Sequence, residues 1–440
     1  MRRLFAGQLQ RNIGFNVGLQ GAMYIIPLLS VPHLLHHLGP HQFGIVAFAQ
    51  ALTQYLCVLV DYGHPLTVTR QIALGRTDPA RVAHAFWTTI VARMLLGCVA
   101  FAIFVVCLQL LPHDGDETRV YWCVFPTVIG SVVFPSWLFQ GLERFRTLMS
   151  IQIATRGLAL IGILWLVQTP ADDLIAASLL GFQGFFAGAV SFLVALRFVN
   201  GPRGAVSWGR LQASFRDGFH FFFMSAAVTL YTSGSPFIVG LVSSAENVAY
   251  FSLCERVIRP VLVLIAGVAP AAYAYIARLA RSSHADAHSL VVRLVATTAA
   301  MASVVSIAIM ASAQVIVSIL GGNAFLPACT PLRLMAIVPT LVAVSNVLGI
   351  SGLCAMGSGS AVSRVLTPIA LISGPWIGFL SYRFGATGAA VGVLSTEFCV
   401  TLLLVKAYYS RKTTDPSEPE LDEPASNGRD GSDVVFVTSN

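Results

Sequence analysis

The chain has 440 residues, of which 56% are hydrophobic and only 11% are charged, and its mean hydropathy is +0.75. Soluble domains carry about 25% charged residues. This composition therefore excludes an ordinary soluble protein and predicts one that spans a lipid bilayer. The net charge of +7 does not indicate a nucleic-acid partner, because the basic residues occur in short groups along the whole chain.

Apolar stretches of about 20 residues, each long enough to cross a bilayer, follow one another as far as residue 408. The first of them has polar residues and no convincing cleavage site, so we interpret it as a retained helix and not as a signal peptide. The sequence predicts an all-α integral membrane protein with twelve transmembrane helices. They lie near residues 13–33, 43–63, 83–110, 119–139, 151–168, 173–196, 217–241, 247–276, 290–319, 332–356, 362–381 and 386–408.

The distribution of Arg and Lys supports this number of helices and indicates an orientation. Connections on the side of the N-terminus hold 21 basic residues, and the opposite connections hold only three, Arg119, Arg333 and Arg383. Because basic loops stay in the cytoplasm, both termini are predicted to be cytoplasmic. The three remaining basic residues, Arg93, Arg256 and Arg259, lie inside predicted spans.

The chain is predicted to consist of two related halves and a tail. Residues about 205 positions apart resemble one another, as at Gln50 and Glu255 or Pro65 and Pro270. This shift equals six spans, which predicts two pseudo-symmetric six-helix lobes, 1–206 and 207–409, around a central cavity. The segment 410–440 is acidic, contains three Pro and has no early apolar periodicity, so we expect a disordered cytoplasmic tail.

Five segments carry a resemblance to a known family. They are 32–44 (PHLLHHLGPHQFG), 61–73 (DYGHPLTVTRQIA), 135–143 (PSWLFQGLE), 249–256 (AYFSLCER) and 384–390 (FGATGAA) followed by Glu397. Together, and in this order, they resemble the Wzx-like O-antigen and exopolysaccharide flippases of the multidrug/oligosaccharidyl-lipid/polysaccharide exporter superfamily. The similarity extends from about Asn12 to Tyr409. His33 and His36 stand where the family usually has Tyr and Arg.

The resemblance implies a transporter in a bacterial inner membrane, not an enzyme. It would move an undecaprenyl-diphosphate-linked oligosaccharide from the cytoplasmic to the periplasmic leaflet by alternating access. The implied partners are this lipid-linked oligosaccharide, membrane lipids, and a polysaccharide polymerase with its chain-length regulator. No cofactor is implied.

Basic residues inside the membrane are the first candidates for a substrate site, because isolated charges in lipid are costly. Arg93 is either a cavity cation that contacts the diphosphate or an Arg whose head reaches the cytoplasmic headgroups. Glu255 and Arg259 are four residues apart on one helix face, so an ion pair between them is expected, which leaves Arg256 as the freer cation. We expect at least one of Arg256 and Arg259 to contact substrate.

Two carboxylates are candidates for ion coupling. Glu397 lies near the middle of the last span, where it would either carry a coupling ion or make a hydrogen bond between helices. Asp61 lies toward the cytoplasmic end of the second span, and pairing with Arg70 is the simpler interpretation of it.

We expect no metal site. His33, His36, His37 and His41 include pairs at helical spacing, but Pro and Gly interrupt this segment and no Cys or carboxylate is close in sequence. A polar, titratable outer rim is the favoured interpretation of these histidines. The Cys residues lie mostly in apolar stretches and are interpreted as small hydrophobic side chains.

Three other functions remain as alternatives. A multidrug extruder of the same superfamily would favour carboxylates for cationic drugs, whereas the charges inside these spans are mainly Arg. A membrane glycan polymerase or ligase normally builds its site on a large external loop, and the outer connections here are all short. A major-facilitator transporter would carry a Gly-rich Asp/Arg motif, which is absent between Arg70 and Arg81.

Overall fold

The computed structural model describes residues 2–110, 115–199, 207–232 and 234–410, and it does not describe the side chains of 2–25, 28, 116, 220 and 223–232. Most of the predicted tail, 411–440, therefore lies outside the described residues. Over the described ranges all regular secondary structure is helical, which confirms the all-α membrane class. This follows from the composition, because a helix satisfies its own backbone hydrogen bonds in lipid.

The first half of the chain forms eight α-helices and one short 3₁₀ helix. They are α1 (Arg2–Asp61), α2 (His64–Gly75), α3 (Pro79–Leu110), α4 (Gly115–Val124), α5 (Pro126–Val133), α6 (Ser136–Gly141), α7 (Phe145–Leu166), η1 (Pro170–Asp172) and α8 (Asp173–Ala195).

The second half repeats this mixture of long and short helices. Its elements are α9 (Trp208–Thr232), α10 (Ser235–Val242), α11 (Ala245–Ala266), α12 (Val268–Ser282), α13 (His284–Gly321), η2 (Asn323–Ala328), α14 (Cys329–Met335), α15 (Val338–Asn346), the π-helix η3 (Val347–Cys354) and α16 (Gly359–Ser410).

The two longest helices each contain a sharp break at a glycine. The break in α1 is at Gly39, with φ of 72°, and the break in α16 is at Gly385, with φ of 59°. Only glycine adopts such positive φ values without steric strain. Both positions fall between predicted spans, so α1 and α16 each correspond to two spans of the sequence prediction.

Nine stretches of the described chain have the length and apolar composition needed to cross a membrane. Two of these stretches, 29–75 and 359–410, include the breaks at Gly39 and Gly385. The membrane class is thus confirmed, whereas the total of twelve crossings stays a prediction.

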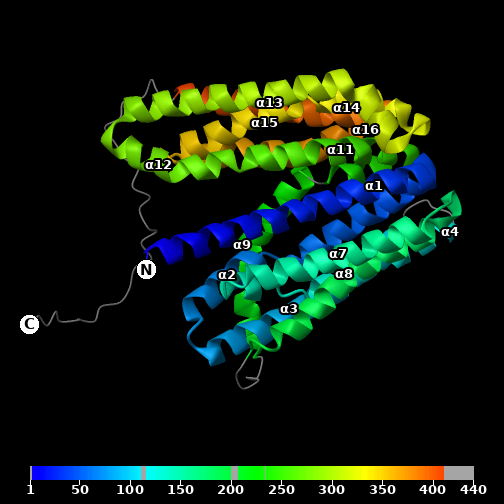
Figure 1. Ribbon diagram of the computed structural model, residues 1–440, viewed down its shortest axis with the longest axis horizontal. Coiled ribbons are helices and arrows are strands. Elements are labelled where there is room, and N and C mark those ends of the chain that lie inside the picture. Colours follow the sequence, from blue (N-terminus) through cyan, green and yellow to red (C-terminus); the bar gives the residue numbers. More distant parts are fainter. Residues whose placement is uncertain (1, 111–114, 200–206, 233, 411–440) are drawn as a thin grey trace, which may run out of the picture.

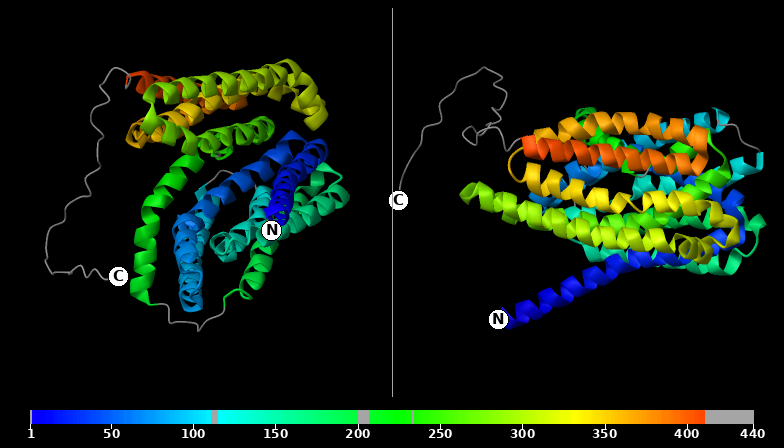
Figure 2. Two further views of the ribbon diagram at one scale, coloured as in Figure 1. Left: turned by 60° about the vertical axis from the view of Figure 1, so that its left-hand side comes forward. Right: turned by 90° about the horizontal axis from the view of Figure 1, so that it is seen from above.

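The helices form two groups that lie side by side. Figure 1 shows α11 to α16 in one group and α1 to α8 in the other, and the views in Figure 2 show the same separation. The helix α1 packs against α11 across the junction and against α3, α5 and α7 within its own group. The helix α9 contacts α1, α3 and α16, so it touches both groups. The boundary of two lobes at residues 206 and 207 stays a prediction.

The order of elements is similar in the two halves. In the first, α1 ends at Asp61 and α2 begins after Gly63; in the second, α11 ends at Ala266 and α12 begins after Gly267. A long helix follows each pair, α3 or α13, and then a run of short helices, α4 to α6 or η2 to η3. The ends of α1 and α11 are 205 residues apart in the sequence, which matches the repeat expected from the sequence.

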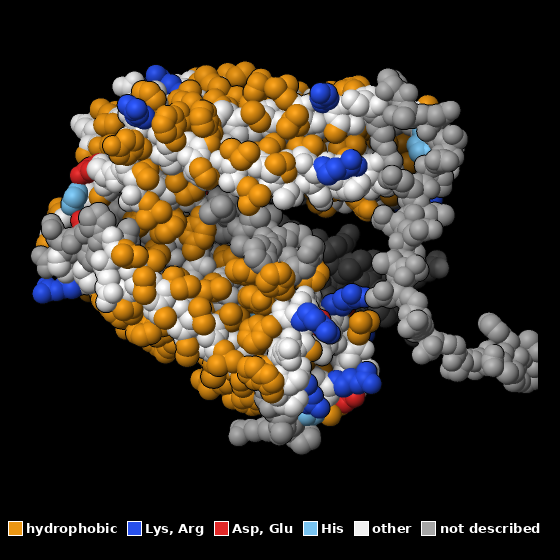
Figure 3. All heavy atoms as spheres, turned by 180° about the vertical axis from the view of Figure 1, so that it is seen from behind, with side chains coloured by type: hydrophobic (Ala, Val, Ile, Leu, Met, Phe, Trp, Pro, Cys, Tyr) orange, Lys and Arg blue, Asp and Glu red, His pale blue; other side chains and the backbone are white. Residues whose placement is uncertain are grey.

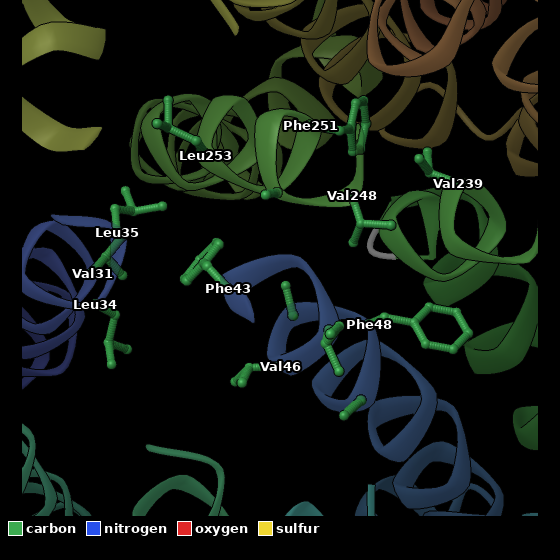
Figure 4. Close-up of a cluster of buried hydrophobic side chains, with 14 of the residues drawn as sticks. Val31, Leu34, Leu35, Phe43, Val46, Phe48, Val239, Val248, Phe251 and Leu253 are labelled. Atoms are coloured by element: carbon green, nitrogen blue, oxygen red, sulfur yellow. The ribbon is translucent and has the colours of Figure 1, made fainter. Parts of the chain in front are cut away.

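The hydrophobic core is continuous across the junction. Its largest cluster contains side chains from α1, α10 and α11, which Figure 4 shows at the point where these helices meet. Phe43 and Phe48 of α1 point toward this junction, and Val248 and Phe251 of α11 lie opposite. Two smaller clusters lie within the separate groups, one around Trp137 and one around Val347. The two groups therefore share one core at their contact and have further cores of their own.

The contact of α1 with α11 needs a glycine at position 44. A Cβ atom there would lie 1.9 Å from the carbonyl oxygen of Ala245, a backbone atom that cannot move by itself. We therefore expect Gly44→Ala to lower the free energy of unfolding by about 1–3 kcal/mol, measured as thermal or denaturant unfolding in detergent. Gly157→Ala in α7 is the matched control, because nothing lies within 4 Å of its Cβ. Equal stability of the two variants would contradict this description of the junction.

Candidate functional site

The junction of α1 and α11 brings together polar residues of the second and eighth predicted spans and polar residues that directly precede these spans. Because Gly44 has no side chain, the two backbones approach closely beside Ala245. On one side of this approach, His41 Nδ1 lies 2.8 Å from Glu246 Oε1. On the other side, Gln50 contacts Arg256. The two helices are thus joined by polar contacts on both sides of their closest approach.

Arg256 is held between two side chains of α1. Its Nη2 donates a hydrogen bond of 3.0 Å to Gln50 Oε1, and its guanidinium lies 5.3 Å from the centre of the Phe43 ring. Such a cation–π contact is favourable when the cation has lost part of its water. Both of these partners are neutral, so they fix the position of the Arg256 charge without adding a counter-charge. The carboxylate of Glu255, the preceding residue, also attracts this guanidinium. The expectation that Arg256 is the freer cation stays a prediction.

Glu255 and Arg259 form the expected ion pair one turn apart on α11. Arg259 Nη2 donates to Glu255 Oε1, which confirms the pairing predicted from their spacing. The Glu255 side chain is 17% exposed and the Arg259 side chain is 49% exposed. The charges of Glu255, Arg256 and Arg259 therefore sum to a single positive charge, next to the contact with α1. The fourth charged residue of α11, Glu246, lies in its first turn and contacts His41.

Arg93 is buried, and its side chain is only 1% exposed. Its Nη2 donates to Asp61 Oδ1 and its Nη1 donates to the carbonyl oxygen of Phe134 at 3.0 Å. Asp61 is the last residue of α1, and Phe134 directly follows α5. One guanidinium of α3 thus joins the places where two other helices end.

These contacts correct two sequence interpretations. The Arg93 head does not reach the headgroup region, because it is bonded inside the protein. The carboxylate of Asp61 pairs with Arg93 and not with Arg70. A substrate contact of Arg93 and an ion-coupling role of Asp61 stay predictions.

Glu397 lies in the second part of α16, after the break at Gly385, and it is partly buried. It therefore belongs to the group formed by α11 to α16, whereas Asp61 belongs to the other group (Figure 1). The two predicted coupling carboxylates thus lie on helices of different groups, and the coupling roles expected of them stay predictions.

The histidines near the break in α1 have separate partners. His33 Nε2 lies 2.7 Å from the carbonyl oxygen of Val167. His37 Nδ1 lies 2.8 Å from the carbonyl oxygen of His33. His36 Nδ1 lies 2.9 Å from the Pro32 carbonyl oxygen, and His41 contacts Glu246. In the described part of the chain, no three His, Cys, Asp or Glu side chains are grouped so that they could hold a metal ion.

Two cavities lie near opposite ends of the helices. A cavity of about 710 Å³ is lined by α2, α3 and α9, and three of its residues are Arg70, Arg81 and Arg210. A second, of about 570 Å³, lies between the two groups, and its lining includes Glu117 and Glu246. Figure 3 shows in addition that the surface is hollowed between the two groups, with Lys and Arg side chains on the rim. This hollow is at the end of the molecule where α1 begins.

The arrangement at the junction is suited to binding an anion. A cation that is held by neutral partners inside an apolar bundle attracts a negative group more strongly than the same cation does in water. Charged groups inside a membrane bundle usually face the bundle interior or a wet cavity.

Comparison with known proteins identifies the family. A family profile described as "Polysaccharide biosynthesis protein" matches residues 9–280. The chain belongs to this family.

Relatives in the family are named as transporters. A putative O-antigen transporter of Escherichia coli K12 is 28% identical over 398 residues, which are 90% of this chain and 96% of the relative. A putative O-antigen transporter of Shigella dysenteriae is 24% identical over 91% of this chain and 100% of the relative. The succinoglycan biosynthesis transport protein ExoT of Rhizobium meliloti is 26% identical over a shorter segment, 31% of this chain and 28% of its own length. The resemblance to the Wzx-like flippases is confirmed.

Two solved structures share the fold of this chain. An inward-facing multidrug resistance transporter of the MATE family has a TM-score of 0.65 at 12% identity, over 89% of this chain and 96% of the other. A MATE transporter in a bent conformation has a TM-score of 0.51 at 14% identity, over 89% of this chain and 92% of the other. At this low identity, the likeness shows that the chain has the same fold as these two structures and shows nothing about its function.

Sequence reasoning did not assign a role to Gln50, Glu246, Arg81 or Arg210, and it considered Arg70 only as a partner of Asp61. A signal for two of these residues was present, because His41 and Glu246 are 205 positions apart and Gln50 and Arg256 are 206 apart. In a twofold repeat, residues near the symmetry axis contact their own counterparts. The three arginines come from three separate helices, so no local pattern could group them.

The pair of the buried Arg93 with Asp61, whose side chain is 43% exposed, is expected to be needed for stability. Asp61→Ala leaves a buried guanidinium without its counter-charge, which should cost about 3–5 kcal/mol. Arg93→Met combined with Asp61→Ala should recover a large part of this loss, because it removes both charges. Arg76→Gln is the control. It breaks an exposed pair with Glu143 at 3.0 Å and should cost about 0–1 kcal/mol. The free energy of unfolding of the three purified variants is measured in detergent. If Asp61→Ala and Arg76→Gln lower it by similar amounts, the pair of Arg93 with Asp61 contributes no more to stability than an exposed ion pair does.

Proposed function

We propose that the protein moves undecaprenyl-diphosphate-linked oligosaccharide units from the cytoplasmic to the periplasmic leaflet of a bacterial inner membrane, for O-antigen, capsule or exopolysaccharide synthesis. The observation that carries the proposal is the position of Arg256, whose guanidinium is held by Gln50 and Phe43 at the junction of the two groups. This charge lies in a chain that is matched over nearly its whole length by relatives named O-antigen transporters.

The physical difficulty of this transport is to carry a diphosphate and a hydrophilic glycan past about 30 Å of hydrocarbon. Fixed arginines would offset the loss of water from the diphosphate, while the prenyl chain stays in lipid. We assign the diphosphate to Arg256 and Arg259, with Glu255 holding Arg259 in place until the substrate arrives. Arg259 is the more exposed of the two arginines and is suited to first contact. Arg93 would support the site by fixing the ends of α1 and α5.

Alternating access would follow from a rocking movement of the two groups about the junction of α1 and α11. The hollow between the groups at the end where α1 begins (Figure 3) corresponds to the cytoplasmic side in the predicted orientation. At the other end, the contact of His41 with Glu246 joins the groups.

The direction of transport agrees with the membrane potential. An anionic headgroup that crosses toward the positive outside gains about 2.3 kcal/mol per charge per 100 mV. Glu397 and Asp61 are the proposed sites for any additional ion coupling. The polysaccharide polymerase and chain-length regulator are proposed as partners that act on the translocated unit.

A multidrug extruder is the alternative function, and the fold of the MATE structures agrees with it. The positive charge at the junction favours an anionic substrate instead. A membrane polymerase or ligase is the less favoured alternative, because the relatives are named as transporters.

The proposal predicts loss of lipid translocation when the junction charges are removed. In proteoliposomes with labelled undecaprenyl-diphosphate-linked oligosaccharide, Arg256→Gln and Arg259→Gln should each slow transport about tenfold or more, since losing about 1.4 kcal/mol of interaction corresponds to a factor of ten. Arg256→Lys keeps the charge and should retain part of the activity. Arg364→Gln, at an exposed arginine of α16, is the control and should transport normally.

The same vesicles separate the proposal from its alternative. If the wild-type protein fails to move the lipid but expels cationic dyes, the drug-extruder function replaces the flippase function. If the wild type moves the lipid and both glutamine variants match it, the lipid is the substrate but the junction arginines do not bind it.

Glu397 is expected to affect coupling and not substrate binding. If it carries the coupling ion, Glu397→Gln should abolish the acceleration of transport by an imposed proton or sodium gradient and should leave the rate without a gradient nearly unchanged. The measurement is the ratio of the two rates, with Glu143→Gln, an exposed carboxylate of the other group, as the control. A wild-type rate that responds to neither gradient would remove the coupling role.

A further inference from the structure

The cavity between α2, α3 and α9 is separate from the proposed translocation site. It has a volume of about 710 Å³, and its lining contains residues of α2, α3 and α9 only. None of Glu255, Arg256 and Arg259 lines it. A ligand of this cavity would therefore bind at a site separate from the one proposed for the transported substrate.

The lining of this cavity is basic. Arg70, Arg81 and Arg210 contribute three positive charges from three helices, and Asp217 is the one acid among the lining residues. All three arginines are exposed, so their guanidinium groups are open to a ligand. An arginine guanidinium offers several donors in a plane that matches the oxygens of a phosphate. The charge and its geometry favour a phosphate-bearing anion.

Two of the arginines are already oriented by neighbours. Arg210 Nη1 lies 3.0 Å from His84 Nδ1. Because the arginine is always charged and donates, His84 must accept at Nδ1 in this contact. Arg81 Nε pairs with Asp78 at 3.1 Å, an acid outside the lining, which leaves its two terminal nitrogens available. Side chains held in this way lose less freedom when they bind a ligand.

The rest of the lining combines small polar and apolar groups. Thr88 and Ser214 offer hydroxyl groups, and the Ser214 hydroxyl also contacts the buried His64 at 3.3 Å. Val68, Leu74 and Ala85 provide apolar wall. A basic face beside an apolar wall is suited to the headgroup of a lipid, with its phosphate on the arginines and the first carbons of its chains on the wall.

The position of the cavity agrees with this ligand. Arg70, Arg81 and Arg210 all belong to the connections on the side of the N-terminus, the predicted cytoplasmic side, where anionic lipids attract basic side chains. Basic pockets between transmembrane helices on this side bind lipid headgroups in other proteins. The cavity also lies where α9, which contacts both groups of helices, packs on α2 and α3.

We propose that the cavity formed by α2, α3 and α9 binds the phosphate headgroup of an anionic lipid of the cytoplasmic leaflet, through Arg70, Arg81 and Arg210. A bound headgroup would tie α9 to α2 and α3. The lipid would be either an anionic phospholipid of the bilayer or the diphosphate lipid itself at a site outside the transport path. The proposal does not rest on which lipid the protein transports.

The test measures lipid binding and not transport. The purified full-length protein in neutral detergent is titrated with phosphatidylglycerol, with undecaprenyl diphosphate, with inorganic diphosphate and with zwitterionic phosphatidylcholine, and bound lipid is followed by native mass spectrometry and by the shift in melting temperature. The triple variant R70Q/R81Q/R210Q should bind anionic lipid about a hundredfold more weakly, since each arginine near a membrane surface contributes about 1 kcal/mol.

Two further variants make the outcome specific to the cavity. R278Q/R281Q/R364Q removes three exposed arginines of α12 and α16 and is the matched control for loss of charge. Ala213→Trp fills the cavity from α9 and leaves its arginines in place. We expect the control to bind lipid like the wild type and Ala213→Trp to bind as weakly as the triple variant. The melting temperature in phosphatidylcholine alone shows which variants are folded.

Each result supports or overturns the proposal. Stronger binding of phosphatidylglycerol or of undecaprenyl diphosphate, lost in the triple and Ala213→Trp variants, supports it and identifies the source of the headgroup. Equal losses in the triple variant and its control would show a general effect of charge and overturn it. Binding that survives Ala213→Trp, or binding of inorganic diphosphate without either lipid, would overturn it as well. A failure of transport in the vesicle experiments leaves all these binding results unchanged.

Discussion

The close contact of α1 with α11 is the constraint on which the arrangement of the two groups depends. The carbonyl of Ala245 lies so near Gly44 that no side chain fits between them. In a membrane protein, helices gain little from burying apolar surface away from lipid, so close packing at small residues and polar contacts hold them together. The junction has both, since Gln50 and Arg256 join the helices on one side of Gly44 and His41 and Glu246 on the other.

The two polar contacts of this junction, His41 with Glu246 and Gln50 with Arg256, span nearly the same number of residues. Each joins residues separated by 205 or 206 positions, the same shift that relates the two halves of the sequence. A contact between counterparts lies near the axis that relates them, where a relative rotation of the halves produces the smallest displacement. In the proposed alternating-access movement, the α1–α11 junction would therefore serve as the pivot, and contacts farther from it would change the most.

Much of the fold could be predicted from the sequence because membrane helices are governed by local composition. The breaks at Gly39 and Gly385 lie where apolar stretches were separated by Gly and polar residues. The pair of Glu255 with Arg259 was predictable because residues four apart on a helix share a face. The partner of Arg93 was not, because Asp61 is 32 residues away on another helix. The sequence interpretation paired Asp61 with Arg70, which is nearer in sequence. In the structure, Arg93 of α3 pairs with Asp61 because α3 packs against the end of α1.

The difference between Arg93 and Arg256 shows how one residue type serves two purposes inside a membrane protein. Arg93 is neutralised by Asp61 and also satisfies the carbonyl of Phe134, so it stabilises two helix ends that would otherwise leave polar groups unpaired. A diphosphate could recruit Arg93 only by competing with a carboxylate. Arg256 is held by Gln50 and Phe43, two neutral side chains that position its charge. An anion that reaches Arg256 would therefore compete with a neutral amide and an aromatic ring, whereas an anion at Arg93 would have to displace a carboxylate, which is why the proposed function assigns the phosphate to Arg256.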